Sequence, residues 1–310
     1  MGGEALARRA AERWGLGGAK LEHLGTSASS VWRCDHDGQH GYLRLGDASA
    51  RSLELVLGEL ALVERLAASG VAVAPPRRSL GNSLVETLEA DGARVHAVLF
   101  EEAPGVLVEP GDPLRDEGLL RAWGSWMGRM HRAVVGFAPP PPGWRWPWHE
   151  EPLLAGAEAL LPRDDQAVRA ELRRILAQLA ALPRGAETFG LTHADLGPQN
   201  FRYQPGHGVT AFDFDNACFH WFVSDVAIAL STLRRRPREA RDAYRTWMLD
   251  AYRREHPLPE LLEAALDTFL QLRIVYVYLD RLQRFGDSEA PEHRELLRAL
   301  RERVLERFCW

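Results

Sequence analysis

Two short motifs in the second half of the chain constrain its fold and chemistry more than any other feature. The first is His-Ala-Asp at 193–195, followed by Asn200, and the second is Asp-Phe-Asp at 213–215. A short apolar stretch at 209–212 precedes the second motif and is typical of a strand that carries a carboxylate out at its end. The two motifs therefore predict a strand–loop–strand segment with a carboxylate base, an amide and a metal-binding carboxylate.

This order of residues matches the order that phosphoryl transfer needs. In the loop H-R-D-L-x-x-x-N, the Asp accepts the proton of the acceptor hydroxyl and the Asn binds Mg²⁺. The chain keeps both residues at that spacing, and Ala194 replaces the Arg. Asp195 is the predicted base, and Asn200 and Asp213 are the predicted Mg²⁺ ligands because this ion prefers oxygen donors.

With these motifs, and with the run 221–227 that follows them, the chain resembles the aminoglycoside phosphotransferase-like (choline kinase-like) branch of the protein-kinase fold. The resemblance implies an α+β, bilobal protein-kinase-like fold with a small antiparallel-sheet N-terminal lobe, a mostly helical C-terminal lobe and an active site between them. It implies ATP as the donor, although some relatives use GTP. It also implies that Asp215 assists at the metal site, either as an additional metal carboxylate or as a carboxylate that supports the direct ligands.

The N-terminal third alternates strand and turn. Asp-Gly dipeptides at 37–38 and 91–92 are typical of tight hairpins. Helical spacing of apolar residues predicts a helix over 50–68 between the two hairpins. We expect a five-stranded small lobe and a hinge near 101–105. The predicted strands are 29–34, 41–45, 83–88 and 94–100, and 1–14 is predicted to be an amphipathic helix.

The rest of the chain is predicted to be mostly helical. Apolar stripes indicate helices over 118–135, 164–182, 239–254, 261–285 and 291–308. This change in pattern predicts an N-terminal lobe at 1–103 that binds nucleotide and a C-terminal lobe at 104–310 with the catalytic loop, metal site and acceptor pocket.

The nucleotide site is predicted from three places in the first lobe. The loop 25–31 would cover the phosphates with backbone N–H groups and hydroxyls, with Ser27, Ser29 and Ser30 as donors. Leu99 to Ala103 would present hinge backbone groups to the purine, with Glu101 and Ala103 as the predicted contacts.

Arg44 stands where kinases place a phosphate-binding Lys. Its predicted partner is Glu59 in the following helix, with Glu54 as the alternative. Arg keeps the charge but differs from Lys in reach and fork geometry, so the phosphate contact stays open.

Several other residues are predicted to support the site rather than to react. His193 is expected to pack under the loop. Asp225 is expected to be a buried hydrogen-bond acceptor that braces the loop. Tyr276, Tyr278, Asp280 and Arg281 lie on a segment predicted to enclose the acceptor.

Composition excludes several classes of function. A net charge of -5 and a pI near 6.1 argue against nucleic-acid binding, which normally needs a basic excess. The chain has three cysteines without a C-x-x-C pair, which argues against a disulfide framework or a zinc site. No apolar run reaches the roughly 20 residues that span a bilayer. We therefore expect a cytoplasmic protein with no membrane partner, either a monomer or a homodimer.

The predicted function is ATP-dependent transfer of the γ-phosphoryl group to a hydroxyl of a small molecule, assisted by Mg²⁺. Two alternatives stay open, a serine/threonine protein kinase of the bacterial stress-response type and a nucleotide-binding pseudokinase scaffold. The short connection from Asp215 to the apolar run 223–230 leaves little room for a peptide platform and favours the small molecule.

Overall fold

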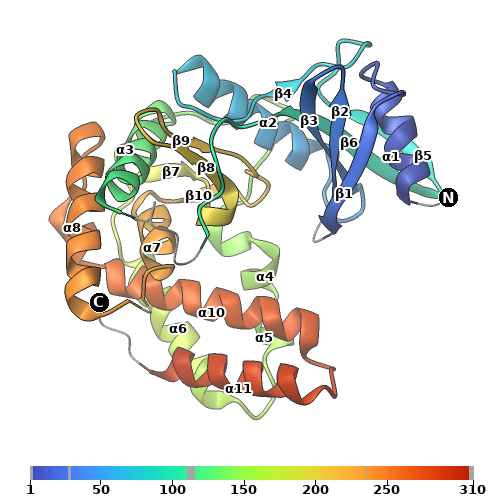
Figure 1. The fold of residues 1–310 in the computed structure, drawn as a ribbon. Coiled ribbons are helices and arrows are strands. Elements are labelled where there is room, and N and C mark those ends of the chain that lie inside the picture. Colours follow the sequence, from blue (N-terminus) through green and yellow to red (C-terminus); the bar gives the residue numbers. More distant parts are fainter. Residues whose placement is uncertain (1–2, 27–28, 110–115, 235, 307–310) are drawn as a thin grey trace. The chain divides into compact units, whose positions relative to one another are not determined.

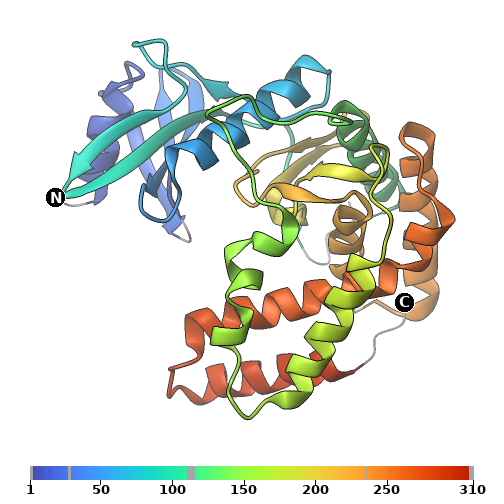
Figure 2. The same cartoon turned by 180° about the vertical axis from the view of Figure 1, so that it is seen from behind.

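The computed structural model describes residues 3–26, 29–109, 116–234 and 236–306 (Figures 1 and 2). These residues form two compact units. Unit 1 takes in 1–109, 138–145 and 198–215, and unit 2 takes in 110–137, 146–197 and 216–310. Each unit is assembled from separate stretches of chain, so the predicted boundary after Ala103 stays a prediction. The predicted α+β class is confirmed.

Unit 1 is built on an antiparallel sheet of six strands, so the prediction of five was wrong. The strand order is β1-β2-β3-β6-β4, and β5 pairs with β6. The missed strand β1 has almost no buried side chains, so it lacks the alternation that identifies a half-buried strand. The bounds are β1 Lys20–Thr26, β2 Ser29–His36, β3 Gln39–Asp47, β4 Pro76–Arg77, β5 Glu86–Ala90 and β6 Ala93–Glu101.

Both predicted hairpins are confirmed. Asp37 and Gly38 have φ values of 49° and 76°, and Asp91 and Gly92 have 51° and 79°. Positive φ at both central residues is the type I′ conformation, whose twist matches that of the flanking strands.

Alternating side chains give the sheet two apolar faces. Leu43, Ala97 and Leu99 pack with α1 (Gly3–Glu12), whereas Val98 packs with α2 (Leu53–Ala68). Figure 1 shows the two helices on opposite sides of the sheet. Residue 44 of β3 therefore faces α2, and this sets the direction of Arg44.

A further hairpin completes unit 1. β8 (Phe201–Gln204) pairs with β9 (Gly208–Ala211), and a short 3₁₀ turn η2 (Pro198–Asn200) leads into it. Backbone hydrogen bonds tie Ala211 to Ala72 and Ala74, and Tyr203 to Val106. The open end of this hairpin carries Asn200 before β8 and Asp213 after β9.

Unit 2 is mostly helical, as predicted. Its bounds are α3 Glu117–Ala133, η1 Trp148–Glu150, α4 Pro152–Ala155, α5 Ala157–Leu160, α6 Gln166–Ala180, β7 Phe189–Thr192, β10 Cys218–Trp221, α7 Val223–Ser231, α8 Arg238–Glu255, α9 Glu260–Ala264, α10 Leu266–Phe285 and α11 Pro291–Leu305. The predicted helix 261–285 is thus two helices that meet at Ala265.

Close packing of α3 on α8 organises one side of unit 2. Added side chains at Gly124 and Gly128 would clash with the backbone oxygens of Met248 and Tyr252, so these glycines allow the close approach. β7 and β10 form a two-stranded ribbon, and the predicted catalytic loop follows β7 directly. None of the described helices is long and apolar enough to cross a membrane.

Candidate active site

A buried carboxylate holds the predicted catalytic loop, whose residues 193–195 lie in unit 2. The backbone N–H groups of His193 and Ala194 each donate a 2.8 Å hydrogen bond to the carboxylate of Asp225 in α7. Ala194 has a φ of 64°, a left-handed conformation that costs a non-glycine residue roughly 1–3 kcal/mol. The two hydrogen bonds compensate for that strain. The predictions that Asp225 braces the loop and that His193 is buried are confirmed.

The Asp225 carboxylate also belongs to a buried network. His131 of α3 contacts Asp225 Oδ2 through Nε2 at 3.1 Å and the Tyr252 hydroxyl through Nδ1 at 2.9 Å. Its ring stacks on Phe222 with centroids 4.6 Å apart. Burial opposes the ionisation of Asp225, but the hydrogen bonds from His131 and the backbone outweigh it and lower its pKa. The sequence motifs did not point to His131.

Asp195 itself is paired with a residue of α10. Arg273 Nη2 donates a 2.6 Å hydrogen bond to Asp195 Oδ1. Sequence reasoning missed Arg273, although it had singled out the same helix for the acceptor pocket. Among the residues singled out there, Tyr278 is buried, and the expectation that this segment encloses the acceptor stays a prediction. Burial and the neighbouring Glu151 raise the pKa of Tyr276.

The predicted metal ligands lie in unit 1, at the open end of the β8–β9 hairpin. Phe212 N–H donates a 3.0 Å hydrogen bond to the Asn200 carbonyl. This hydrogen bond brings Asn200 close to Asp213, the residue that follows Phe212. Asp213 has a φ of 64°, and its side chain is 47% exposed. A strained, accessible carboxylate next to an amide suits an ion that takes few protein ligands.

The chemistry of these donors fits Mg²⁺ better than a transition metal. Within the described residues, no three His, Cys, Asp or Glu side chains gather as a metal cage. An amide oxygen and a carboxylate leave most of an octahedron to water and phosphate oxygens, which is how Mg²⁺ binds in phosphoryl-transfer sites.

Arg44 is paired with Glu59, as predicted. Its two terminal nitrogens donate to the two Glu59 oxygens at 2.8 Å and 2.6 Å, and Glu59 is 2% exposed. Arg44 also lies 3.6 Å from Asp213 Oδ1 and above the Phe100 ring. Burial opposes the charge on Arg44, but Glu59 outweighs it and raises its pKa. The fork of the arginine makes this pairing bidentate.

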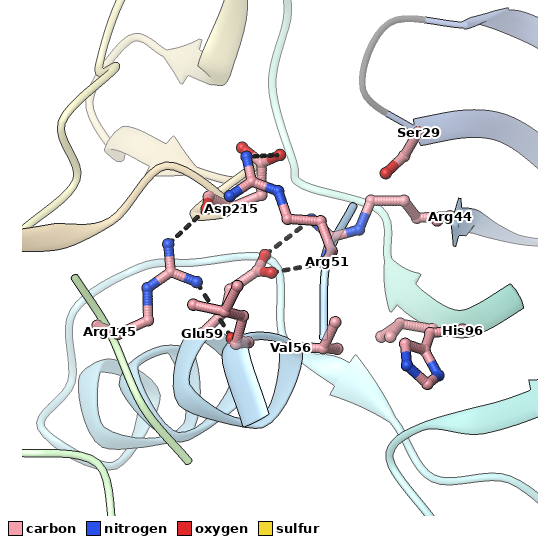
Figure 3. Close-up of a pocket in the computed structure, with 11 residues that line it drawn as sticks. Ser29, Arg44, Arg51, Val56, Glu59, His96, Arg145 and Asp215 are labelled. Carbon is pink, nitrogen blue, oxygen red and sulfur yellow. Dashed lines mark hydrogen bonds and ion pairs between the residues drawn. The ribbon is translucent and has the colours of Figure 1, made fainter. Parts of the chain in front are cut away.

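Asp215 is engaged by two further arginines that sequence reasoning missed (Figure 3). Arg51 Nη2 donates to Asp215 Oδ2 at 3.2 Å, and Arg145 donates to the Asp215 backbone carbonyl. Arg145 also donates to the Leu55 carbonyl at 3.1 Å and is almost completely buried. It thereby connects α2 to the Asp-Phe-Asp motif.

The structure does not place the three predicted phosphate-loop serines together. Ser29 lines a pocket with Arg44, Arg51 and Asp215. The Ser30 hydroxyl lies on the opposite face of β2, where it accepts a 2.9 Å hydrogen bond from Trp32 Nε1, so its side chain is not placed with Ser29. Ser27 lies outside the described residues.

The predicted hinge has one backbone group suited to a purine. Glu101 N–H donates to the Pro75 carbonyl at 2.9 Å, and the Ala103 carbonyl accepts from Arg202 at 2.9 Å. Among the described residues, none accepts a hydrogen bond from the buried Ala103 N–H. A buried N–H without a protein acceptor is costly, and a ligand acceptor would satisfy it.

Comparison with known proteins decides the family. A model described as the phosphotransferase enzyme family matches residues 21–262. The chain belongs to this family. It is a phosphotransferase, a kinase that uses an alcohol group as the acceptor.

Individual relatives agree with this assignment. The phosphotransferase is 28% identical to amicoumacin kinase of Bacillus subtilis (strain 168), over 97% of its own length and 91% of that protein. It is 31% identical to homoserine kinase of Pseudomonas aeruginosa over 51% of its length and 50% of that protein.

Solved structures confirm the predicted kinase-like fold. An amicoumacin kinase in complex with AMP-PNP and Ca²⁺ has a TM-score of 0.89 and 26% identity, with 99% of this phosphotransferase and 94% of that chain covered. A microcompartment-associated aminopropanol kinase has a TM-score of 0.82 at 20% identity, covering 97% and 95%, which shows the fold alone.

Proposed function

We propose that this phosphotransferase transfers the γ-phosphoryl group of ATP to a hydroxyl of a small molecule, with Asp195 as the base and with Mg²⁺ held by Asn200 and Asp213. The observation that carries the proposal is the braced loop, in which Asp225 accepts hydrogen bonds from both His193 and Ala194 at 2.8 Å. A protein that did not use Asp195 would have little reason to keep a strained, buried support beneath it.

The nucleotide would bind to unit 1. Ala103 N–H would donate to the purine, Ser29 and the N–H groups of its loop would contact the phosphates, and Arg44 would supply positive charge near them. The relative solved with AMP-PNP and Ca²⁺ supports a nucleoside triphosphate with a divalent ion. GTP would make the same phosphate contacts, so the choice of ATP over GTP as the donor rests on the AMP-PNP in that relative alone.

When bound, Mg²⁺ would neutralise charge on the transferred phosphoryl group. Asn200 and Asp213 would hold the ion, and Arg44, 3.6 Å from Asp213, would help to keep that carboxylate in place. Asp195 would accept a hydrogen bond from the acceptor hydroxyl, orient its oxygen and take its proton as the new P–O bond forms. Arg273 would hold Asp195 in position.

The acceptor is proposed to be a small polar compound. The relatives named as kinases of amicoumacin and homoserine support this class. The route from Asp215 to α7 contains only the short strand β10, which supports a small acceptor over a peptide. Cys34 and Cys218 are both buried thiols, which supports a reducing, cytoplasmic setting.

The test is a screen of hydroxyl-bearing metabolites and antibiotics with ATP and Mg²⁺, read by the mass gain of a phosphoryl group on the product. We expect the wild type to phosphorylate a small compound and Asp195→Asn to lose that product. Labelling of protein substrates instead, with the same dependence on Asp195, would replace the small-molecule acceptor by a protein.

A further inference from the structure

Unit 1 contains an open pocket beside Arg44, and its lining includes charged residues that are not among the proposed nucleotide contacts. It has a volume of about 370 Å³, space open to solvent included, and all of its lining residues belong to this unit. Its polar lining includes Ser29, Arg44, Arg51, Glu59, Arg145 and Asp215. Figure 3 shows the guanidinium of Arg51 turned toward Asp215, with Ser29 and Arg44 on the neighbouring strands.

Arg44 cannot neutralise a polyphosphate alone. Both terminal nitrogens of Arg44 donate to the carboxylate of Glu59, and Glu59 is buried. The Glu59 carboxylate cannot reach water unless its ion pair with Arg44 breaks. The positive charge of Arg44 is therefore largely balanced inside the protein. A further cation on the protein would add to the charge that the metal ion and Arg44 offer to a nucleoside triphosphate.

Arg51 is placed to be that cation. It precedes α2, its side chain is about one-fifth exposed, and Nη2 lies 3.2 Å from Asp215 Oδ2. Arg51 therefore shares the pocket with Arg44 and Ser29, which are proposed above to act near the phosphates. The Asp215 carboxylate fixes the direction of Arg51, and Arg145 fixes the backbone of Asp215.

We infer that Arg51 contacts the phosphate groups of the nucleotide and that Asp215 is a positioning residue for Arg51 rather than a metal ligand. The inference rests on the proposed function. It assigns the pocket to polyphosphate, with Arg51 giving charge-assisted hydrogen bonds to phosphate oxygens. It also leaves Asn200 and Asp213 as the protein ligands of the metal, because the Asp215 side chain is only 15% exposed and is hydrogen-bonded to Arg51, whereas that of Asp213 is 47% exposed.

The experiment measures binding, not turnover. Calorimetry with adenosine and with AMP-PNP, each with and without Mg²⁺, separates the base, phosphate and metal contributions. Arg51→Met should weaken AMP-PNP binding roughly 10- to 100-fold, the range for a lost hydrogen bond to a charged group, and leave adenosine binding unchanged. Arg51→Lys keeps the charge without the fork and should lie between wild type and Arg51→Met.

The role of Asp215 is tested by its metal dependence. Asp215→Asn should weaken AMP-PNP binding but keep the wild-type ratio of affinities with and without Mg²⁺, whereas Asp213→Asn should lose that ratio. Adding Asp215→Asn to Arg51→Met should weaken binding no further, because the two residues act as one unit. Arg78→Met is the matched control, since Arg78 is exposed in the same unit and pairs with Glu64.

Three outcomes would overturn the inference. They are AMP-PNP affinity unchanged in Arg51→Met, loss of the Mg²⁺ ratio in Asp215→Asn, and full additivity in the double variant. A wild type that binds neither AMP-PNP nor a guanine analogue would instead overturn the proposed function, and the inference with it.

Discussion

Arg273 Nη2 and Asp195 Oδ1 lie 2.6 Å apart, so an arginine of α10 holds the proposed base of the catalytic loop. The two residues are 78 positions apart in sequence. A guanidinium on one oxygen restricts the rotamer of the carboxylate and thereby sets where its other oxygen points. Helix α10 therefore takes part in orienting the proposed base.

Replacing Arg273 with Gln should lower kcat roughly 10-fold, because small displacements of a catalytic group can reduce the rate up to about 10²-fold. The nucleotide Kd should stay constant, since Arg273 is not among the proposed nucleotide contacts. Arg284→Gln is the control on the same helix, because Arg284 is exposed and pairs with Asp280. A kcat equal to wild type would show that Asp195 is oriented without Arg273.

The Asp225 network makes a prediction about stability. Asp225→Asn should reduce the free energy of unfolding by about 1–3 kcal/mol, the range for leaving a buried donor without its hydrogen bond. An amide can accept from only one of the two backbone N–H groups and turns its NH₂ toward the other. Urea unfolding measures the loss, and Asp250→Asn on an exposed part of α8 is the control. A loss of unfolding free energy smaller than that of the control would show that Asp225 does not brace the loop.

The residues of this network mark what the sequence could and could not show. Asp225 was predicted because it follows the metal motif at a short, recognisable distance. His131 precedes Asp225 by 94 positions, and Arg51 precedes Asp215 by 164. The sequence around His131 or Arg51 has no local pattern that indicates the partner of either residue. Contacts of that separation depend on the tertiary fold, so only the fold revealed them.

His220 should make folding sensitive to acid. Burial lowers its pKa to about 3, and Nδ1 accepts a 2.9 Å hydrogen bond from Trp221 N–H, so the folded state keeps this ring neutral. Below the ordinary pKa near 6.5, the unfolded chain takes up a proton that the folded chain refuses. The stability from this residue is therefore present above about pH 6.5 and is lost as the pH falls toward 3.

The expected size of that loss is of the order of 2–3 kcal/mol between pH 7 and pH 4.5, from about 1.4 kcal/mol per pH unit. Urea unfolding at several pH values measures it. The pKa values of His96 and His256 are also lowered, so the decisive quantity is the difference in slope between wild type and His220→Gln. Equal slopes would show that His220 does not carry the effect.

The segment 138–145 should fix the position of α2. Trp144 N–H donates to the Glu54 carbonyl at 2.9 Å, and a Cβ at Gly58 would clash with the Trp144 backbone. Gly58→Ala should lower the free energy of unfolding by about 1–3 kcal/mol through overpacking. Alanine favours a helix by about 1 kcal/mol, so a variant more stable than wild type would contradict this packing. Glu64→Ala, exposed on the same helix, is the control.

The boundaries of the fold show the same division between local and long-range information. Both Asp-Gly hairpins follow from local turn chemistry, and their φ values match it. Strand β4 has only two residues and is defined by its pairing with β6. The sequence Pro76–Arg77 contains no pattern that predicts a strand. The break at Ala265 between α9 and α10 has no glycine or proline to mark it.

The most direct test of the account is single-turnover phosphoryl transfer from ATP to the acceptor found in the screen, measured by rapid quench for wild type and Asp195→Asn. The account predicts a rate roughly 10²–10⁴-fold lower in the variant, the usual range for a lost general base, with the Kd for Mg²⁺·ATP within about twofold of wild type. A variant with an intact transfer rate and weakened ATP binding would contradict the assignment of Asp195 and, with it, the proposed mechanism.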